Sequence, residues 1–489
     1  MREYLLVLDE GTTSTRAMLF TADGRCIASE ASALTQHYPQ PHWVEHDAAE
    51  IWRRSLNVTA AMVAQAGGAD HIAAIGIANQ RETVVFWDKV TGEPLAPAIV
   101  WQDRRTAADC RRLRDAGHEP LVQSRSGLIL DPYFSASKIG WALRHWPQLA
   151  EAGDRLAIGT VDSWLVWKLT GGLHITDASN ASRTALMNTA PGGGWDDDLA
   201  ALFDVPLAAL PEITDCAGRF GTTSAFGGAI PITGLAGDQQ AATIGQACLK
   251  PGETKATFGT GAFILSVTGT RACTSDHRLL STIAWQIDGA RSYALEGSVF
   301  VAGSLIQWLR DSLGLIRDAA ETDALARSVS DSAGVYVVPA LSGLGAPWWE
   351  PDARAAISGL SFATGKPHVV RAALEAMAHQ AHDLKTAFAA DGQDWHRLRI
   401  DGGMVANDWM AQDLADMLAL KVERPHFAET TALGAAMLAG VGAGLFGSLD
   451  EAAVMRGPTT AFRPSLDASA RTARLAGWAD AVRRVTGQA

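Results

Sequence analysis

The stretch that decides the fold is "YLLVLDEGTTSTRAMLF", residues 4–20. Two apolar runs flank a short turn of glycine and hydroxyl residues, so the pattern predicts a strand, a tight turn and a second strand. Backbone N–H groups and hydroxyls in such a turn form a concavity that binds anions. The carboxylates of Asp9 and Glu10 nevertheless stand at the mouth of the turn, where they would repel a bare phosphate. An anion that binds here therefore needs a positively charged companion.

The same pattern returns later in the chain. Residues 254–269, "TKATFGTGAFILSVTG", predict a strand, a glycine turn and a strand, and residues 291–314 predict a strand followed by a helix. Residues 398–408, "LRIDGGMVAND", predict a strand, a glycine turn and a helix capped by Asn407. This repetition indicates a duplicated α/β chain. A Pro-Gly turn within residues 249–255 marks the boundary, so we expect domains at 1–248 and 249–489.

Two further segments of the first half carry clear signals. Asp47 and Glu50, three residues apart, predict a capping box that starts a helix. Residues 71–80, "HIAAIGIANQ", predict a buried strand. The uncharged residues 430–449 resemble a membrane span, but five glycines and the absence of flanking basic clusters favour a tightly packed interior helix.

The overall composition excludes several classes of protein. A formal net charge of −12 without a basic run argues against nucleic-acid binding and against an anionic membrane surface. Five widely spaced cysteines without a CxxC pair indicate neither a disulfide framework nor a zinc site. No apolar signal segment precedes the first predicted strand, so we expect a cytoplasmic protein that is not integral to a membrane.

These segments together resemble the duplicated core of the sugar kinase, Hsp70 and actin superfamily, and more closely the glycerol kinases of the FGGY carbohydrate kinase family. The resemblance covers nearly the whole chain. It rests on "LDEGTTSTRA", "PHWVEHDAAEIW", "GIANQRETVVFWD", "AIVWQDRRTA", "DPYFSASKIGW", "TDASNASRT", "GLAGDQQAA", "TFGTGAF", "LEGSVFVAGSLIQWLRD", "GLGAPWWEPDARAAISGL", "DGGMVAND" and "TTALGAAMLAG". It implies two actin-like, ribonuclease H-like domains around a central cleft, and phosphorylation of glycerol by ATP to sn-glycerol 3-phosphate.

The resemblance also assigns the phosphate and nucleotide residues. Asp9, with Asp238, would hold the Mg²⁺ that accompanies ATP. This cation would offset the repulsion between the carboxylates at the first turn and a bound phosphate. Glu10 departs from the glutamine that is common in the family, and would point either to the water shell of the metal or away from the site. The predicted nucleotide and phosphate residues are Thr12, Thr13, Ser14, Arg16, Thr260, Gly261, Gly303, Gln307, Gly403 and Asn407.

Asp238 is the candidate general base, because a carboxylate beside the attacking hydroxyl orients it and accepts its proton. The alternative for Asp238 is a helix N-cap. By resemblance, the glycerol contacts are Arg81, Glu82, Trp101, Tyr133, Asp238, Gln239 and Phe263. For Arg81 and Glu82 the alternative is a surface ion pair, and for Trp101 and Phe263 it is packing in the core.

Other interpretations stay open at this point. "HWVEH", residues 42–46, matches the HxxEH zinc-protease pattern, but two prolines before it favour an extended segment. A kinase for another polyol or a ketopentose is the alternative within the family, and an Hsp70-like ATPase is the alternative outside it. We expect a homodimer or homotetramer. Residues 220–231 lack the arginine found in relatives that respond to fructose 1,6-bisphosphate, so we expect a weak or absent response.

Overall fold

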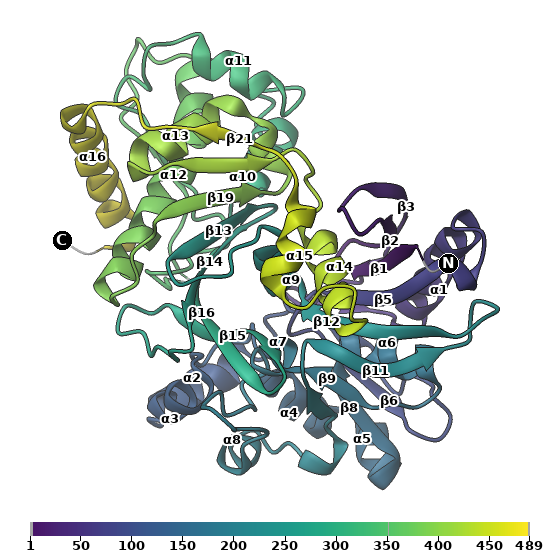
Figure 1. Cartoon of the computed structure of the whole chain (residues 1–489). Helices are drawn as coiled ribbons and strands as arrows, with labels where there is room; N and C mark the ends of the chain where they lie inside the picture. Colours follow the sequence, from purple (N-terminus) through teal and green to yellow (C-terminus); the bar gives the residue numbers. More distant parts are fainter. Residues whose placement is uncertain (1–2, 351, 488–489) are drawn as a thin grey trace.

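The computed structural model describes residues 3–350 and 352–487. Within them, two large mixed β-sheets form the framework, one from each half of the chain (Figure 1). The first sheet has the order β11-β12-β5-β1-β2-β3, and the second has the order β15-β16-β14-β13-β19-β20-β21. The strands of the first sheet are β1 (Tyr4–Glu10), β2 (Ser14–Phe20), β3 (Cys26–Ala33), β5 (Ile72–Asn79), β11 (Ala217–Thr223) and β12 (Ile230–Gly237). Those of the second are β13 (Glu253–Phe258), β14 (Ala262–Gly269), β15 (Leu280–Ile287), β16 (Ala290–Val299), β19 (Arg397–Asp401), β20 (Val422–Pro425) and β21 (Thr459–Phe462).

The two sheets repeat one topology. In the first, β3, β2 and β1 form an antiparallel meander, and β5 and β12 continue the sheet parallel to β1. In the second, β16, β14 and β13 form the meander, and β19 and β20 continue it parallel to β13. The predicted duplication and the α/β class with two ribonuclease H-like domains are therefore confirmed.

Smaller sheets and the helices surround this framework. The short strands are β4 (Glu45–His46), β6 (Val84–Asp88), β7 (Ala98–Ile99), β8 (Leu156–Thr160), β9 (Ile175–Asp177), β10 (Glu212–Thr214), β17 (Tyr336–Val338) and β18 (Ala356–Ser358). The α-helices are α1 (Ala48–Gln65), α2 (Ala107–Asp115), α3 (Glu119–Ser126), α4 (Ser135–His145), α5 (Pro147–Ala152), α6 (Val161–Thr170), α7 (Ala178–Ala181), α8 (Asp197–Leu202), α9 (Asp238–Gly245), α10 (Gly303–Asp311), α11 (Glu321–Arg327), α12 (Lys366–Ala390), α13 (Asp408–Leu418), α14 (Thr430–Gly442), α15 (Leu449–Ala452) and α16 (Ala468–Thr486).

The start of α1 agrees with the sequence only in part. The Asp47 side chain caps the helix by accepting a hydrogen bond from the backbone N–H of Ala49. The predicted capping box is wrong, because the Glu50 carboxylate accepts from the backbone and hydroxyl of Thr35 and from Arg54. Glu50 thereby connects α1 to the segment after β3.

The HxxEH segment does not form a helix that could bind zinc. His42 has a positive φ of 68°, and Glu45–His46 form strand β4, so the two histidines do not share a helix face. Across residues 3–350 and 352–487, no group of three or more His, Cys, Asp or Glu side chains is arranged to hold a metal ion. The extended interpretation is correct at Glu45–His46, whereas His42 lies in a turn.

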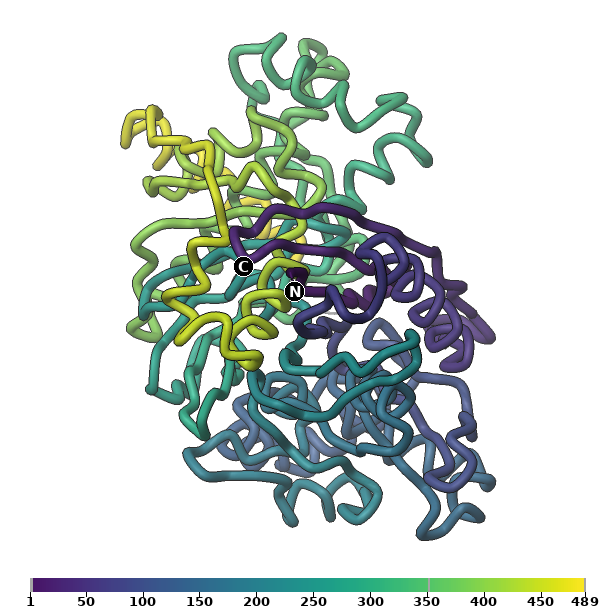
Figure 2. Tube along the Cα trace, turned by 45° about the vertical axis from the view of Figure 1, so that its right-hand side comes forward, coloured from purple at the N-terminus to yellow at the C-terminus, as the bar shows by residue number. Residues whose placement is uncertain are grey.

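Helix α14 is the interior helix predicted for residues 430–449. It comes from the second half of the sequence, but its apolar side chains pack in one cluster with Leu5, Val7 and Ala74 of the first sheet. Both views place this yellow-green helix beside the purple and blue strands of the first half (Figures 1 and 2). A Cβ atom on Gly434 would lie 1.8 Å from the backbone oxygen of Ala241 in α9, so glycine allows the two helices to touch through their backbones. In the described part of the chain, no helix is long and apolar enough to cross a membrane.

Candidate active site

The first glycine turn, residues 11–13, connects β1 to β2. The Gly11 N–H donates to the backbone oxygen of Ser14 at 3.0 Å, which closes the turn. Gln80, directly after β5, holds the start of this turn through two hydrogen bonds. Its side-chain amide donates to the Gly11 oxygen at 2.9 Å, and its backbone N–H donates to the Glu10 oxygen at 2.7 Å. Gln80 is not among the residues predicted for the site, although it is the last residue of the strand predicted at 71–80, and the structure pairs that strand with β1.

Glu10 lies away from the site. Its side chain is fully buried, and the Ser55 hydroxyl of α1 donates to its Oε2 at 2.6 Å. Burial raises the pKa of Glu10 to about 8, although hydrogen bonds from Ser55 and Thr15 lower it. Of the two orientations that the sequence leaves open, the structure therefore shows the one that faces away from a metal.

The negative charge of Asp238 acts on the carboxyl group of Asp9. Burial, and next the charge of Asp238, raise the pKa of Asp9 to about 7. Asp238 is the first residue of α9, and burial raises its pKa as well, against the lowering effect of Arg81 and Lys255. Two carboxylates whose charges act on each other are a suitable donor pair for a divalent ion that keeps most of its water.

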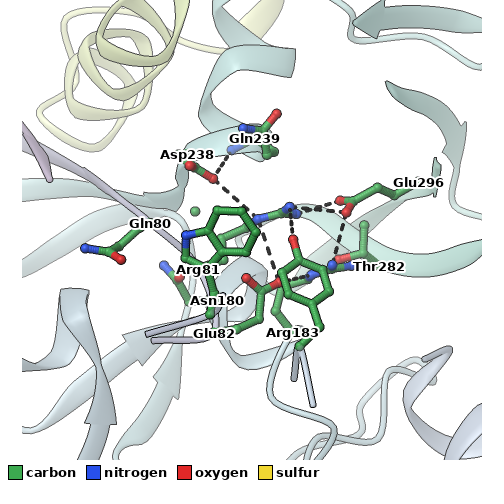
Figure 3. A network of polar contacts seen from close by, with 12 residues as sticks. Gln80, Arg81, Glu82, Asn180, Arg183, Asp238, Gln239, Thr282 and Glu296 are labelled. Atoms are coloured by element: carbon green, nitrogen blue, oxygen red, sulfur yellow. Dashed lines mark hydrogen bonds and ion pairs between the residues drawn. The ribbon is translucent and has the colours of Figure 1, made fainter. Parts of the chain in front are cut away.

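Asp238 does not cap its helix in the usual way. Gly237 occupies the N-cap position, and the Asp238 carboxylate accepts from the backbone N–H of Gln239 at 2.7 Å. The interpretation of Asp238 as the N-cap is therefore wrong by one residue, since Asp238 is the first residue inside the helix. The carboxylate also lies 3.4 Å from Nε of Arg81, which turns it toward the predicted substrate residues (Figure 3).

Arg81 is the centre of the predicted substrate set. Its guanidinium forms a bidentate ion pair with Glu296, at 2.6 Å and 3.2 Å, and donates to the Tyr133 hydroxyl at 3.2 Å. Glu82 has a positive φ of 61° and accepts from Nε of Arg183 at 2.7 Å. Arg81 and Glu82 are 2% and 1% exposed, so the surface ion-pair interpretation is wrong.

Aromatic rings from both halves form one wall of the site. The Trp101 ring lies 5.6 Å from the ring of Tyr133 and 6.1 Å from that of Phe263, measured between centroids. Phe263 comes from β14 of the second half. Trp101 and Phe263 are both only partly buried, and both also pack against the main apolar cluster, so part of each side chain stays accessible. Such a wall suits the carbon backbone of a small alcohol.

Gln239 is tied to a lysine that sequence reasoning missed. The Lys255 ammonium donates to the Gln239 side-chain oxygen, and to the Thr257 hydroxyl at 2.8 Å. Thr257 in turn donates to Asp401 at 2.5 Å. Burial lowers the pKa of Lys255 to about 8. Only the fold reveals this chain of contacts, since its members come from β13, α9 and β19.

Five of the six nucleotide residues predicted in the second half line one cavity of about 460 Å³. Thr260, Gly303, Gln307, Gly403 and Asn407 line it, together with residues of α11 and α12 that were not predicted. Gly261 is not among the lining residues, because its Cβ position faces the backbone oxygen of Val299 at 2.5 Å.

The remaining phosphate-loop residues have varied surroundings. The Thr12 hydroxyl accepts a hydrogen bond from the Trp101 indole, whereas Thr13 is exposed and Ser14 begins β2. Arg16 forms an ion pair with Glu429, the residue before α14, and so is engaged with protein in this structure. The prediction that Arg16 contacts phosphate stays a prediction.

Two repeated sheets, each with a glycine turn beside its first hairpin, define the class: an α/β fold with two ribonuclease H-like domains and a polar site assembled from both. Family models agree with this assignment. Residues 4–245 match the N-terminal domain, and residues 254–443 the C-terminal domain, of the FGGY family of carbohydrate kinases. The chain belongs to this family.

Similar proteins cover the full length. A glycerol kinase from Alcanivorax borkumensis is 53% identical over 99% of this chain and 98% of the relative. Glycerol kinase 1 from Pseudomonas aeruginosa is 50% identical over all of both chains. The crystal structure of Plasmodium falciparum glycerol kinase with ADP superposes with a TM-score of 0.92 at 36% identity, covering 99% of this chain and 98% of that one. A ligand-bound xylulose kinase from Lactobacillus acidophilus shares the fold, with a TM-score of 0.89 at 20% identity and coverage of 99% of both chains.

Proposed function

We propose that this protein transfers the γ-phosphoryl group of ATP to a terminal hydroxyl of glycerol, and so forms sn-glycerol 3-phosphate and ADP. The observation that carries the proposal is the convergence of Arg81, Glu82 and Asp238 (Figure 3). Tyr133 bonds to Arg81 and stands next to Trp101, whose ring lies beside that of Phe263. The relatives named glycerol kinase, at about half identity over the full length, favour glycerol among the family's substrates.

Different side chains contact the carbon atoms and the hydroxyl groups of the alcohol. Trp101 and Phe263 pack against its carbon atoms, while Arg81 donates to one hydroxyl and Glu82 accepts from another. Asp238 accepts the proton of the attacking hydroxyl as the new O–P bond forms and the bond to the leaving ADP oxygen breaks. A carboxyl whose pKa is raised by burial is a stronger base than an exposed aspartate, which suits this role.

Asp9 and Asp238 are the residues that would hold Mg²⁺, since carboxylates are hard oxygen donors and the charge of Asp238 acts on Asp9. When bound, the metal would neutralise charge on the ATP phosphates. Thr12, Thr13, Ser14 and Arg16 are proposed phosphate contacts, and the 460 Å³ cavity is the proposed nucleotide pocket. We further propose domains at 1–248 and 249–489, a homodimer or homotetramer, and a place in the cytoplasm.

A polyol panel with Mg²⁺ and ATP tests the substrate. We expect glycerol to give the highest kcat/KM, measured by ADP release, with sn-glycerol 3-phosphate identified as the product. A higher kcat/KM for erythritol or a pentulose would favour the alternative, an FGGY kinase for another polyol or ketopentose. ATP turnover that ignores every added alcohol would overturn the proposal altogether.

A further inference from the structure

Glu296 is a buried carboxylate of the second half that lies among side chains of the first half. It stands on β16, is completely buried, and is not one of the residues predicted from the sequence. Its Oε2 and Oε1 accept from the two terminal nitrogens of Arg81, at 2.6 Å and 3.2 Å. Its Oε1 also accepts from Nη2 of Arg183, at 3.0 Å (Figure 3).

These contacts fix the direction of the Arg81 guanidinium. Glu296 occupies its terminal edge, which leaves Nε directed toward Asp238 at 3.4 Å. A bidentate pair between arginine and carboxylate is planar and holds the guanidinium in one orientation. Glu296 therefore determines that Nε of Arg81 faces the proposed base, Asp238, although Glu296 itself binds the opposite edge of the guanidinium.

The same carboxylate reaches Glu82 indirectly. Arg183 uses Nη2 for Glu296 and Nε for Glu82, at 2.7 Å, so it spans the two acidic side chains. All four groups are at most 2% exposed, and their two positive and two negative charges balance. Burial raises the pKa of Glu296, but Arg183 and Arg81 outweigh it and hold the pKa at about 2. Loss of Glu296 would leave Arg81 and Arg183 without their shared buried partner, with only Glu82 and the less buried Asp238 to balance their charges.

We propose that Glu296 is a positioning residue for the alcohol substrate: it orients Arg81 directly, and Glu82 through Arg183, for contact with adjacent hydroxyls. This inference rests on the proposed function. Because Glu296 comes from β16 and its partners come from the first half, the alcohol pocket is complete only when both halves are joined. A buried ion pair by itself adds little to stability, so stability alone is a weak reason for this arrangement.

The variant Glu296→Gln tests the role, because it keeps the size of the side chain and removes its charge. We expect kcat/KM for glycerol to fall about 100-fold, the size expected when a substrate contact shifts by roughly 1 Å. We expect KM for ATP to stay within about twofold, because the nucleotide cavity has no contact with Glu296. Calorimetric titration of glycerol without nucleotide should show weaker binding, which gives a readout independent of turnover.

Asp413→Asn is the matched control. Asp413 is a buried carboxylate in a bidentate pair with Arg474, at 2.6 Å and 3.0 Å, and it belongs to α13, outside the proposed site. Its replacement should lower the melting temperature but leave both KM values and kcat unchanged. If Asp413→Asn and Glu296→Gln had equal effects on glycerol kinetics, the role of Glu296 would be merely structural.

A milder variant protects the test against misfolding. The Ser298 hydroxyl donates to Oε1 of Glu296 at 3.2 Å, so Ser298→Ala loosens the carboxylate without removing it. We expect a rise of about fivefold in KM for glycerol, less than the full effect of a hydrogen bond to a charged group, because the carboxylate itself stays in place. The inference is overturned if folded Glu296→Gln keeps kcat/KM for glycerol within threefold of the parent, or if it does not fold and Ser298→Ala leaves KM unchanged. If the parent instead prefers another polyol, the proposed function fails, while the same comparison on that polyol still tests Glu296.

Discussion

The Trp101 indole donates a hydrogen bond to the Thr12 hydroxyl at 2.8 Å. This contact joins the aromatic wall of the proposed alcohol pocket to the first glycine turn, the proposed phosphate site. Trp101 is also anchored through its backbone, because its N–H donates to the Thr83 hydroxyl at 3.2 Å. One side chain therefore fixes the separation between the two sites that must meet for phosphoryl transfer.

Trp101→Phe keeps an aromatic wall and removes the bond to Thr12. A neutral hydrogen bond contributes about 1 kcal/mol, so we expect kcat to fall about fivefold. Initial rates with both substrates varied measure the effect. A large rise in KM for glycerol with unchanged kcat would mean that the indole acts only as a wall.

Asp238→Asn removes the proposed base but keeps the shape of its side chain. We expect kcat to fall by about 10²–10⁴, the usual contribution of a general base. ATP binding, measured by calorimetry, should remain, because the nucleotide cavity is lined by other residues. A near-normal rate in this variant would refute the assignment.

Asp383 gives a prediction about pH and stability. This carboxylate on α12 accepts from the indoles of Trp478 and Trp348, at 2.8 Å and 3.4 Å, and burial raises its pKa to about 7. The folded protein therefore binds a proton that the unfolded chain releases above pH 4, and the stability from this group is lost as pH rises from about 4 to 7. Asp383→Asn stays neutral and can still accept from both indoles. We expect its melting temperature at pH 8 to rise by about 2–4 °C, with a smaller gain at pH 5. An equal gain at both pH values would exclude ionisation as the cause.

Gly434→Ala tests the contact between α14 and α9. Alanine favours a helix over glycine by about 1 kcal/mol, so propensity alone predicts stabilisation. The new Cβ would meet the Ala241 oxygen at 1.8 Å, and we expect a net loss of about 3 kcal/mol or more, measured by chemical denaturation. Gly194→Ala is the control, because nothing lies within 4 Å of its Cβ position. A Gly434→Ala protein as stable as the parent would show that the helices can separate freely.

The response to fructose 1,6-bisphosphate tests the loop after β11. The structure places 220–223 within β11, so the connection to β12 spans only residues 224–229 and contains no basic side chain. The nearby Arg219 is exposed and lines a separate cavity of about 370 Å³. A single exposed arginine contributes little to the binding of a bisphosphate. We expect inhibition to be weak or absent at millimolar bisphosphate. Potent inhibition would contradict the prediction.

Much of the fold could be predicted from local patterns in the sequence. The β1–β2 hairpin and α13 with its Asn407 cap follow from turn chemistry and helix periodicity, which act over a few residues. The site residues Arg81, Tyr133 and Phe263 followed from resemblance, since no spacing rule brings them together.

The missed residues share one property, which is that their partners lie far away in the chain. Glu296 and Arg81 are 215 positions apart in the sequence, and Lys255 reaches Gln239 only because the fold places β13 against α9. The direction of Glu10 was undecidable for the same reason, since it depends on Ser55 of α1. Pairings of this kind are set by tertiary packing, which a single sequence does not display.

The placement of α14 has a consequence for biosynthesis. The apolar cluster on one face of the first sheet contains residues of α9 from the first half, but it is completed only when the ribosome has translated α14 up to Gly442. The N-terminal half therefore exposes part of this apolar surface until the second half is made, and such a surface favours aggregation of the nascent chain.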